Sequence, residues 1–201
     1  MGNPVITAVP ARARLMNGMA TAVVEKGYAA TTIADIVRHA QVSKRTFYEH
    51  FADKQECFLA SFTAASEFLL RLVHEATESD APWPARYPAA ISAYLSALQS
   101  HPAMTRTLLL ELPAAGPRAV ALRRRQLQRF ADLLCENSAR AAREHPGMRA
   151  LTPELSTAIV GGINELVLLA VEEGRAAQVT DLTETATEML RAVLTAAPPG
   201  P

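Results

Sequence analysis

Apolar residues recur at helical spacing along almost every segment longer than ten residues, in place of the strict alternation typical of a half-buried strand. Over residues 11–26, for example, Leu15, Met19 and Val23 fall on one face of a helix that Gly27 is placed to end. Good helix formers, above all Ala, Leu, Arg and Glu, dominate the chain. The sequence therefore predicts an all-α protein.

Three short helices are predicted in quick succession near the N-terminus. The second is about two turns long and can be capped by Thr31 or Thr32. The third covers residues 44–50, with Ser43 as its cap and Phe47 on its buried side. A helix, a short turn and a second short helix form a helix-turn-helix, whose second helix enters the major groove of DNA.

Longer helices are predicted for the remainder, and Asp53 is placed to cap the first of them. They are expected over residues 54–78, 89–100, 102–110, 118–144, 153–173 and 182–196. Because residues 79–88 contain Pro82, Pro84 and Pro88, we expect a loop there that interrupts the bundle.

The helices divide the chain into two expected domains. Residues 11–55 would form the helix-turn-helix DNA-binding domain, and residues 56–197 would form an effector-binding and dimerisation domain. Residues 1–10 are expected to be a loose arm, and the tail over residues 198–201 is expected to be disordered.

Charge and cysteine content restrict the classes of function. The 201 residues include 20 Lys and Arg against 20 Asp and Glu, so DNA binding has to be local rather than spread over a basic surface. Cys57 and Cys135 lack the spacing of a zinc or redox motif, and we expect no metal and no cofactor. With no leader and no membrane-length apolar run, a soluble cytoplasmic protein without a membrane partner is expected.

The third helix carries groups that suit DNA. Arg45 can form a bidentate pair with a guanine edge, and Thr46 can contact a thymine methyl group. Lys44, Tyr48 and His50 can donate to phosphates. Each residue taken singly could equally be a core or surface residue, and their combination favours DNA binding.

Two segments at this point resemble a known family. Thr31-Thr32-Ile33-Ala34-Asp35-Ile36-Val37 and, after it, Val42-Ser43-Lys44-Arg45-Thr46-Phe47-Tyr48-Glu49-His50-Phe51-Ala52-Asp53-Lys54 look like the signature of TetR-type (tetracycline-repressor-like) transcriptional regulators. The resemblance covers roughly residues 11–58, whereas the rest is similar only in being a helical body of suitable length.

The resemblance implies roles for particular residues. Tyr48, His50 and Lys54 would contact phosphates, as would Thr31 or Thr32 at the start of the second helix, where free amides favour an anion. Many relatives carry a small residue in place of Arg45, so their operators do not transfer to this chain. The full expected DNA-binding set is Thr31, Thr32, Ser43, Lys44, Arg45, Thr46, Tyr48, His50 and Lys54.

The last two predicted helices are apolar over more surface than one neighbour can cover, which favours a homodimer over a purely internal core. The expected interface residues are Leu155, Ile159, Gly162, Ile163, Leu166, Val167, Met189 and Val193. A two-fold dimer would read a palindromic operator in double-stranded DNA.

A ligand site would lie between helices of the body, with apolar walls and a few polar groups. Each candidate could also be plain core. The candidates are Phe62, Phe68, Trp83, Tyr87, Tyr94, Met104, Leu108, Glu111, Phe130, Leu134 and Asn164.

These features together predict a DNA-binding transcriptional regulator, with release of a repressor by an unknown small-molecule effector as the expected mechanism. The alternative is a helical interaction protein, or a regulator controlled by a protein partner. An enzyme is not expected, because the common nucleophile, metal and phosphate-binding motifs are missing from the sequence.

Overall fold

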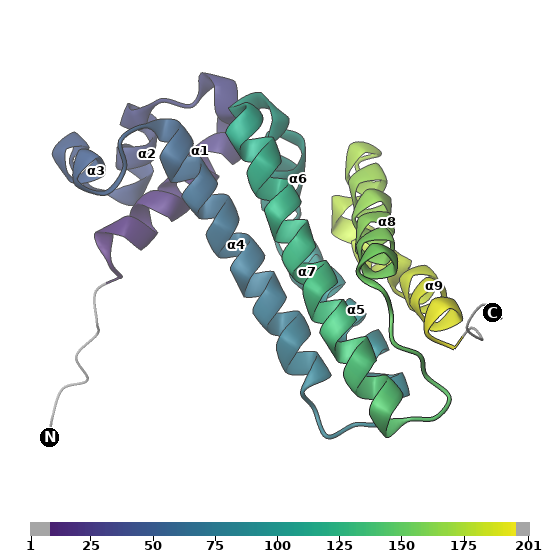
Figure 1. The fold of residues 1–201 in the computed structure, drawn as a ribbon. Coiled ribbons are helices and arrows are strands. Elements are labelled where there is room, and N and C mark those ends of the chain that lie inside the picture. The colour runs from purple at the N-terminus through teal and green to yellow at the C-terminus, as the bar shows by residue number, and fades with distance from the viewer. Residues whose placement is uncertain (1–8, 196–201) are drawn as a thin grey trace, which may run out of the picture.

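In the computed structural model, which describes residues 9–195, the chain folds into nine α-helices and two short 3₁₀ helices, without strands in that range (Figure 1). The prediction of an all-α fold is confirmed. The elements are α1 (Ala11–Ala30), α2 (Ile33–Ala40), α3 (Lys44–His50), α4 (Lys54–Thr77), α5 (Trp83–Gln99), α6 (Pro102–Leu110), η1 (Pro113–Ala115), α7 (Pro117–Glu144), α8 (Pro153–Glu172), η2 (Ala176–Leu182) and α9 (Thr183–Leu194). The expectations for residues 1–8 and 196–201 lie outside the described residues.

The helices form a small head and a longer body. Helices α1–α3 gather at one end of α4, and α4 runs beside α7 along the body (Figure 1). Helix α5 packs on α4, while α8 packs on α7 and, with α9, covers the side of the body away from α4 (Figure 1). Helix α4 therefore belongs to both parts.

The head has its own hydrophobic core. Leu15, Met19, Ile36 and Phe47 from the first three helices are almost inaccessible to solvent, as is Phe58 of α4. Phe47 is the residue that ties α3 to this core, which confirms the predicted inward face of the third helix.

Helices α1 and α2 cross at close range. A Cβ atom on Gly18 would lie 2.6 Å from the backbone oxygen of Ile36, closer than real Cβ atoms approach a backbone atom. Only glycine therefore allows α2 to pack at this distance from α1.

The predicted helix caps are confirmed at three positions. Thr32 caps α2, because its hydroxyl accepts a hydrogen bond from the Asp35 amide. The hydroxyl of Ser43 accepts a hydrogen bond from the Thr46 amide at 3.0 Å and caps α3. The carboxylate of Asp53 accepts from the Glu56 amide and caps α4.

Gly27 interrupts α1 as the sequence predicts. Its φ of 78° lies in the left-handed region that glycine adopts without strain, and a further turn of helical residues follows up to Ala30.

The loop expected over residues 79–88 is wrong for most of its length. Helix α5 begins at Trp83 rather than at residue 89. Pro84 lies in the first turn, where the missing amide would be unpaired in any case, so it favours a helix start instead of a break. Pro88 is tolerated inside the helix at the loss of one backbone hydrogen bond. The 3₁₀ helix η2 is a further element that the sequence pattern did not predict.

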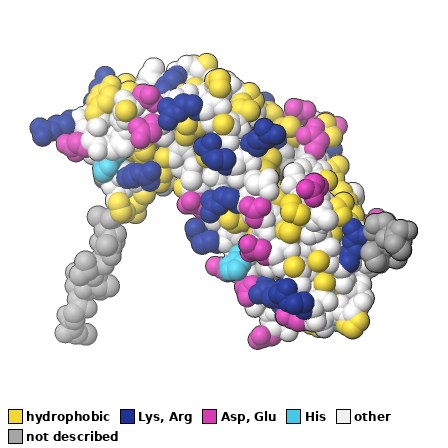
Figure 2. Space-filling model, in the orientation of Figure 1, with side chains coloured by type: hydrophobic (Ala, Val, Ile, Leu, Met, Phe, Trp, Pro, Cys, Tyr) yellow, Lys and Arg dark blue, Asp and Glu magenta, His cyan; other side chains and the backbone are white. Residues whose placement is uncertain are grey.

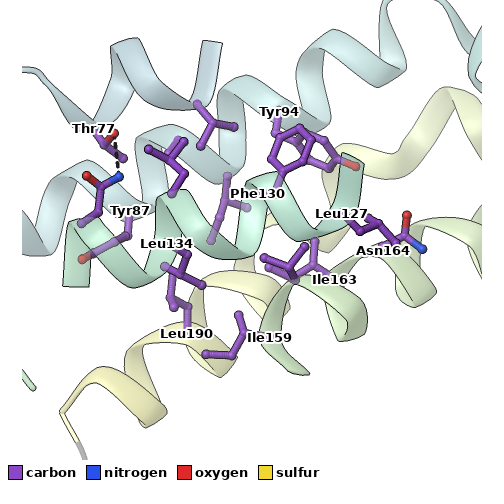
Figure 3. Close-up of a pocket in the computed structure, with 16 residues that line it drawn as sticks. Thr77, Tyr87, Tyr94, Leu127, Phe130, Leu134, Ile159, Ile163, Asn164 and Leu190 are labelled. Atoms are coloured by element: carbon purple, nitrogen blue, oxygen red, sulfur yellow. Dashed lines mark hydrogen bonds between the residues drawn. The ribbon is translucent and has the colours of Figure 1, made fainter. Parts of the chain in front are cut away.

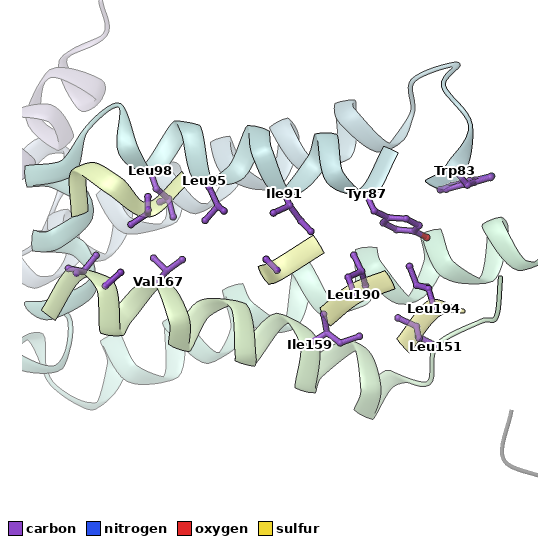
Figure 4. Close-up of a cluster of buried hydrophobic side chains, with 14 of the residues drawn as sticks. Trp83, Tyr87, Ile91, Leu95, Leu98, Leu151, Ile159, Val167, Leu190 and Leu194 are labelled. Atoms are coloured by element: carbon purple, nitrogen blue, oxygen red, sulfur yellow. The ribbon is translucent and has the colours of Figure 1, made fainter. Parts of the chain in front are cut away.

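The body is built on a second core, which lies between α5, α8 and α9 (Figure 4). Ile91 and Leu95 of α5 face Ile159 and Val167 of α8, and Leu190 of α9 completes the contact (Figure 4). All five side chains are less than a tenth exposed. This core holds α8 and α9 on the body independently of the head.

Two helices, α4 and α8, are long and apolar enough to span a membrane by length and composition alone. The expectation that the chain has no membrane-length apolar run is therefore wrong for these two helices. In the fold α4 supplies Phe58 and Phe62 to the core of the head, and α8 supplies Ile159 and Val167 to the core of the body. Their apolar content thus serves helix packing on at least one face.

Candidate DNA-binding surface and ligand cavities

Helix α3 presents a polar surface that is anchored from behind. Phe47 is fully buried, whereas the neighbouring Tyr48 is 59% exposed and packs edge-on against the Phe47 ring. Lys44, Arg45 and His50 are also exposed. The helix therefore offers basic and aromatic donors to solvent while its backbone is held by the head core.

Arg45 is the most open of these groups, because 90% of its side-chain surface is accessible. It makes one ion pair, in which its Nε lies 3.2 Å from a carboxylate oxygen of Glu49 one turn later. An exposed pair of this kind contributes little to stability, so the guanidinium remains available to a base edge. Figure 2 shows Lys and Arg side chains at the α3 end of the head, with both signs of charge mixed over the rest of this face.

The two threonines before α2 are not equivalent. Thr31 is buried, and its hydroxyl donates to the Gly27 backbone oxygen at 2.8 Å. Thr32 is exposed, but its hydroxyl and its amide are both bonded to Asp35. The groups left free for an anion at this helix start are the backbone amides of Ile33 and Ala34, because the Asp35 amide is bonded to Thr32.

Lys54 at the start of α4 binds the backbone of the turn that joins α1 to α2. Its ammonium donates to the backbone oxygens of Tyr28, Ala29 and Thr31, at 3.0, 3.1 and 3.0 Å. It also lies over the Tyr28 ring, 4.7 Å from the centroid. All three ammonium protons are engaged within the head.

An ion pair strengthens the junction between α1 and α2. Lys26 Nζ lies 2.8 Å from a carboxylate oxygen of Asp35, which also accepts hydrogen bonds from Thr32. The hydrogen bonds from Lys26 and from Thr32 hold the pKa of Asp35 well below its usual range.

The body contains two adjoining cavities. The first, which we call the Tyr87 cavity, has a volume of about 100 Å³ and lies between α4, α5, α7, α8 and α9 (Figure 3). The second, the Arg123 cavity, has a volume of about 270 Å³ and is walled by α4, α5, α6, α7 and α8. Tyr94, Leu127, Phe130 and Asn164 line both. Together the cavities reach the lower part of the ~300–1,000 Å³ range of ligand pockets.

The structure brings most of the predicted pocket residues to these cavities. Tyr87, Tyr94, Phe130, Leu134 and Asn164 line the Tyr87 cavity. The residues that line the Arg123 cavity are Phe62, Phe68, Tyr94, Met104, Leu108, Phe130 and Asn164.

Trp83 and Glu111 line neither cavity. The Trp83 ring is buried between the guanidinium groups of Arg86 and Arg140, and its indole NH donates to Glu144. Glu111 follows α6 and accepts a hydrogen bond from the backbone amide of Tyr28. Both residues connect elements of the fold instead of facing a ligand space.

The sequence reasoning missed the basic group of the cavity wall. Arg123 is half-buried on α7 and lines the Arg123 cavity together with Leu127 and Phe130. These residues are spaced four and three apart, which places them on one helical face. The same spacing continues to Leu134, so the apolar stripe of this helix was the signal that could have identified Arg123.

The expected dimer residues divide into two groups. Ile159 and Val167 are buried within the subunit, facing α5, and so are not available to a second copy. The other six are less buried: Leu155, Gly162, Ile163, Leu166, Met189 and Val193. Leu169 on the same helix α8 is 45% exposed.

The described residues hold no group of three or more His, Cys, Asp or Glu side chains that could bind a metal ion. Cys57 is buried in the head, and desolvation raises the pKa of its thiol to about 12. The thiolate that nucleophilic or metal chemistry requires is therefore suppressed at this position.

Comparison with known proteins identifies the head. Residues 20–61 match the family model described as bacterial regulatory proteins, tetR family. That segment contains most of α1, all of α2 and α3, and the first turns of α4. No curated protein sequence matches the chain.

Solved structures extend the likeness to the whole fold. FadR from Bacillus halodurans, a fatty acid degradation regulator, is 16% identical with a TM-score of 0.80 over 92% of this chain and 96% of its own. FadR from Bacillus subtilis, solved in complex with stearoyl-CoA, is 18% identical with a TM-score of 0.75 over 89% and 96%. A TerR/AcrR-family regulator from Aquifex aeolicus VF5 is 22% identical with a TM-score of 0.64 over 92% and 100%.

Proposed function

Because residues 20–61 match the model of the tetR family of bacterial regulatory proteins, we propose that the chain is a regulator of this family, which represses transcription from a palindromic operator and is released by a small-molecule effector. The observation that carries the proposal is the exposed polar face of α3, held in place by the buried Phe47. A repressor of this kind acts in the cytoplasm, where the DNA is.

The proposed contacts fall into two kinds. Arg45 and Thr46 of α3 read base edges in the major groove, and Ser43 begins the helix that carries them. Lys44, Tyr48 and His50 bind phosphates beside the groove, and the amides at the start of α2 bind a further phosphate between Thr31 and Lys54. The exposure of the α3 side chains supports these roles.

The proposed regulator is a homodimer formed through α8 and α9. The partly buried apolar residues of these helices, with Leu169 at 45% exposure, favour a second copy over solvent. A two-fold dimer places its recognition helices in half-sites ~34–36 Å apart, or a multiple of that distance, and so reads a palindrome.

The effector site is proposed to be the pair of cavities in the body. Their walls are largely apolar, and α4 and α6, which line the larger one, both also contact α1 of the head. The structure of Bacillus subtilis FadR contains stearoyl-CoA, so a related fold accommodates a ligand with an aliphatic chain. This neighbour supports a ligand-binding role for the body.

Release requires that the effector prefers the arrangement of helices that does not fit DNA. Shifting the population from mostly competent to mostly incompetent needs a preference on the order of 10⁴, or ~5.5 kcal/mol. A change in α6 would reach the head through Glu111 and Tyr28, whose hydrogen bond joins the two.

The direct test is selection from genomic DNA. Purified protein is mixed with fragments of its source genome at ~150 mM salt, and the bound fragments are sequenced. We expect enrichment of a shared palindrome, and no enrichment with an Arg45→Ala/Tyr48→Ala double variant. Equal recovery of all fragments, or the same palindrome with the double variant, would contradict the proposed role of α3.

A further inference from the structure

The wall of the Arg123 cavity contains a cation without an acidic partner. Arg123 is half-buried, yet within residues 9–195 its guanidinium makes no ion pair and no hydrogen bond. Its charge acts on the neighbouring phenol of Tyr94, where it opposes the rise to about 12 that desolvation causes in the pKa. A partly desolvated cation of this kind favours an anion in the cavity.

Two buried carboxamides lie on the same cavity. Asn164 of α8 is only 7% exposed, lines both cavities and has no hydrogen-bond partner in the described part of the chain. Gln126 of α7 is equally buried, and its oxygen accepts from Arg129 while its NH₂ group has no protein partner there. Buried amide groups are normally hydrogen-bonded, so the unpaired amide atoms of both residues are available to a polar group of a ligand in the cavity.

The Tyr87 cavity has the opposite character. Apart from Thr77, Asn137, Asn164 and the phenols, it is lined by aliphatic and aromatic carbon. Asn137 and Thr77 bond to each other at 3.0 Å and offer little to a ligand. Asn164 and Leu127 lie at one end of this cavity and Tyr87 at the other (Figure 3). Since Asn164 and Leu127 also line the Arg123 cavity, the apolar space continues from the polar one.

We propose that the effector is a single-chain amphiphile with an anionic headgroup. The headgroup pairs with Arg123, and the aliphatic chain passes Asn164 into the Tyr87 cavity. Gln126 and Asn164 donate hydrogen bonds to the oxygens of the ligand headgroup or of the group next to it in the ligand. The inference rests on the proposed role of the body as the effector site. It adds the sign of the effector's charge, the direction in which its aliphatic chain lies and the residue that recognises its headgroup.

The experiment measures binding calorimetrically to the full-length protein, with probes kept below their micelle concentrations. Dodecanoate and dodecyl phosphate are compared with dodecanol and dodecyltrimethylammonium. We expect both anions to bind the parent on the order of 10- to 100-fold more tightly than the alcohol, as a charge-assisted hydrogen bond implies. The ratio between carboxylate and phosphate identifies the kind of head. Shortening the acid should weaken binding roughly fourfold for each methylene removed.

Variants assign the effect to Arg123. Arg123→Gln should lose the preference for the anions and leave dodecanol binding unchanged, whereas Arg123→Lys should keep the preference. Arg124→Gln is the matched control, because Arg124 is exposed on the same helix and lines neither cavity. Circular dichroism checks that each variant is folded.

The inference is wrong if dodecanol or the cation binds the parent as tightly as the acids, if Arg123→Gln keeps the preference, or if no probe binds. Operator binding, measured separately, distinguishes this failure from failure of the proposed function. A protein that binds its operator but none of the anions remains a regulator with a different ligand. One that binds the acids through Arg123 but no operator keeps the assigned site and loses the proposed function.

Discussion

The Glu111 carboxylate, directly after α6, accepts a hydrogen bond from the backbone amide of Tyr28 at 2.9 Å, although 83 residues separate the two along the chain. Tyr28 follows Gly27, where the regular part of α1 ends. Because α6 lines the Arg123 cavity, this bond joins a wall of that cavity to the turn that precedes α2.

Replacing Glu111 tests that connection. Glu111→Ala leaves the largely buried Tyr28 amide without an acceptor, and we expect the free energy of unfolding to fall by about 1–3 kcal/mol. Effector-dependent loss of operator affinity should shrink in the same variant. Denaturant unfolding and operator titration measure the two effects. Glu111→Gln keeps an acceptor and should stay near the parent in both, so equal behaviour of the Ala and Gln variants would argue against the connection.

Lys54 can act by shaping the head or by touching DNA, and salt dependence separates the two. Removing one contact between a cation and a phosphate reduces the magnitude of the slope of log affinity against log salt by about 0.9. Since its three protons are bonded to backbone oxygens, we expect Lys54→Met to weaken the head and operator binding while the slope stays that of the parent. A slope lower by about 0.9 would mean that Lys54 moves to a phosphate, as the family resemblance implies.

Asp35 should make stability fall in acid. Its pKa in the folded protein is held down by Lys26 and Thr32, whereas an unfolded Asp titrates near ~3.9. Below about pH 4 the unfolded state therefore binds more protons, and stability decreases as the pH falls further. Urea unfolding at pH 7 and pH 3 should give a smaller difference for Asp35→Asn and for Lys26→Met than for the parent. An unchanged difference in both variants would rule out this ion pair as a source of acid sensitivity.

The head could be predicted almost completely from the sequence, and the body only in part: α6, α7 and α8 lie where they were expected, whereas the start of α5 and the helix η2 do not follow from the pattern. Thr32, Ser43 and Asp53 cap helices by local chemistry that a sequence displays directly. Pro84 misled because proline in a first turn is compatible with a helix start, and Pro88 misled because the helix tolerates it at the loss of one backbone hydrogen bond. Only the packing of Trp83 against the body fixes where α5 begins.

Site residues followed the same division. The exposed residues of α3 were identified from one short motif. The place of Arg123 in a cavity wall, in contrast, depends on the packing of four other helices that enclose the cavity. Ile159 and Val167 were assigned to a dimer surface because a periodic apolar helix does not reveal which of its faces meets its own core.

The Tyr87 hydroxyl is buried and has no hydrogen-bond partner, although the ring packs in the core of the body. We expect Tyr87→Phe to leave the free energy of unfolding unchanged or to raise it by up to about 1 kcal/mol. The buried hydroxyl loses its hydrogen bonds to water on folding and gains none in the protein, and phenylalanine avoids that cost. Thr77→Val, in the same cavity, removes a hydroxyl that bonds Asn137 and His74 and should lower stability by about 1–3 kcal/mol. A clear loss of stability in Tyr87→Phe would show that the hydroxyl is bonded in solution.

The central claim is that α3 reads a DNA sequence, and a specificity ratio tests it most directly. The affinities of the parent, Arg45→Ala and an Arg124→Ala control are measured at ~150 mM salt for the recovered palindrome and for a scrambled duplex. We expect the parent and the control to prefer the palindrome by about 10³-fold or more. Arg45→Ala should lose ~1–3 kcal/mol on the palindrome, with specificity relaxed at one base position, and change little on the scrambled duplex. Equal affinity of the parent for both duplexes, or a palindrome preference that Arg45→Ala leaves intact, would contradict the account.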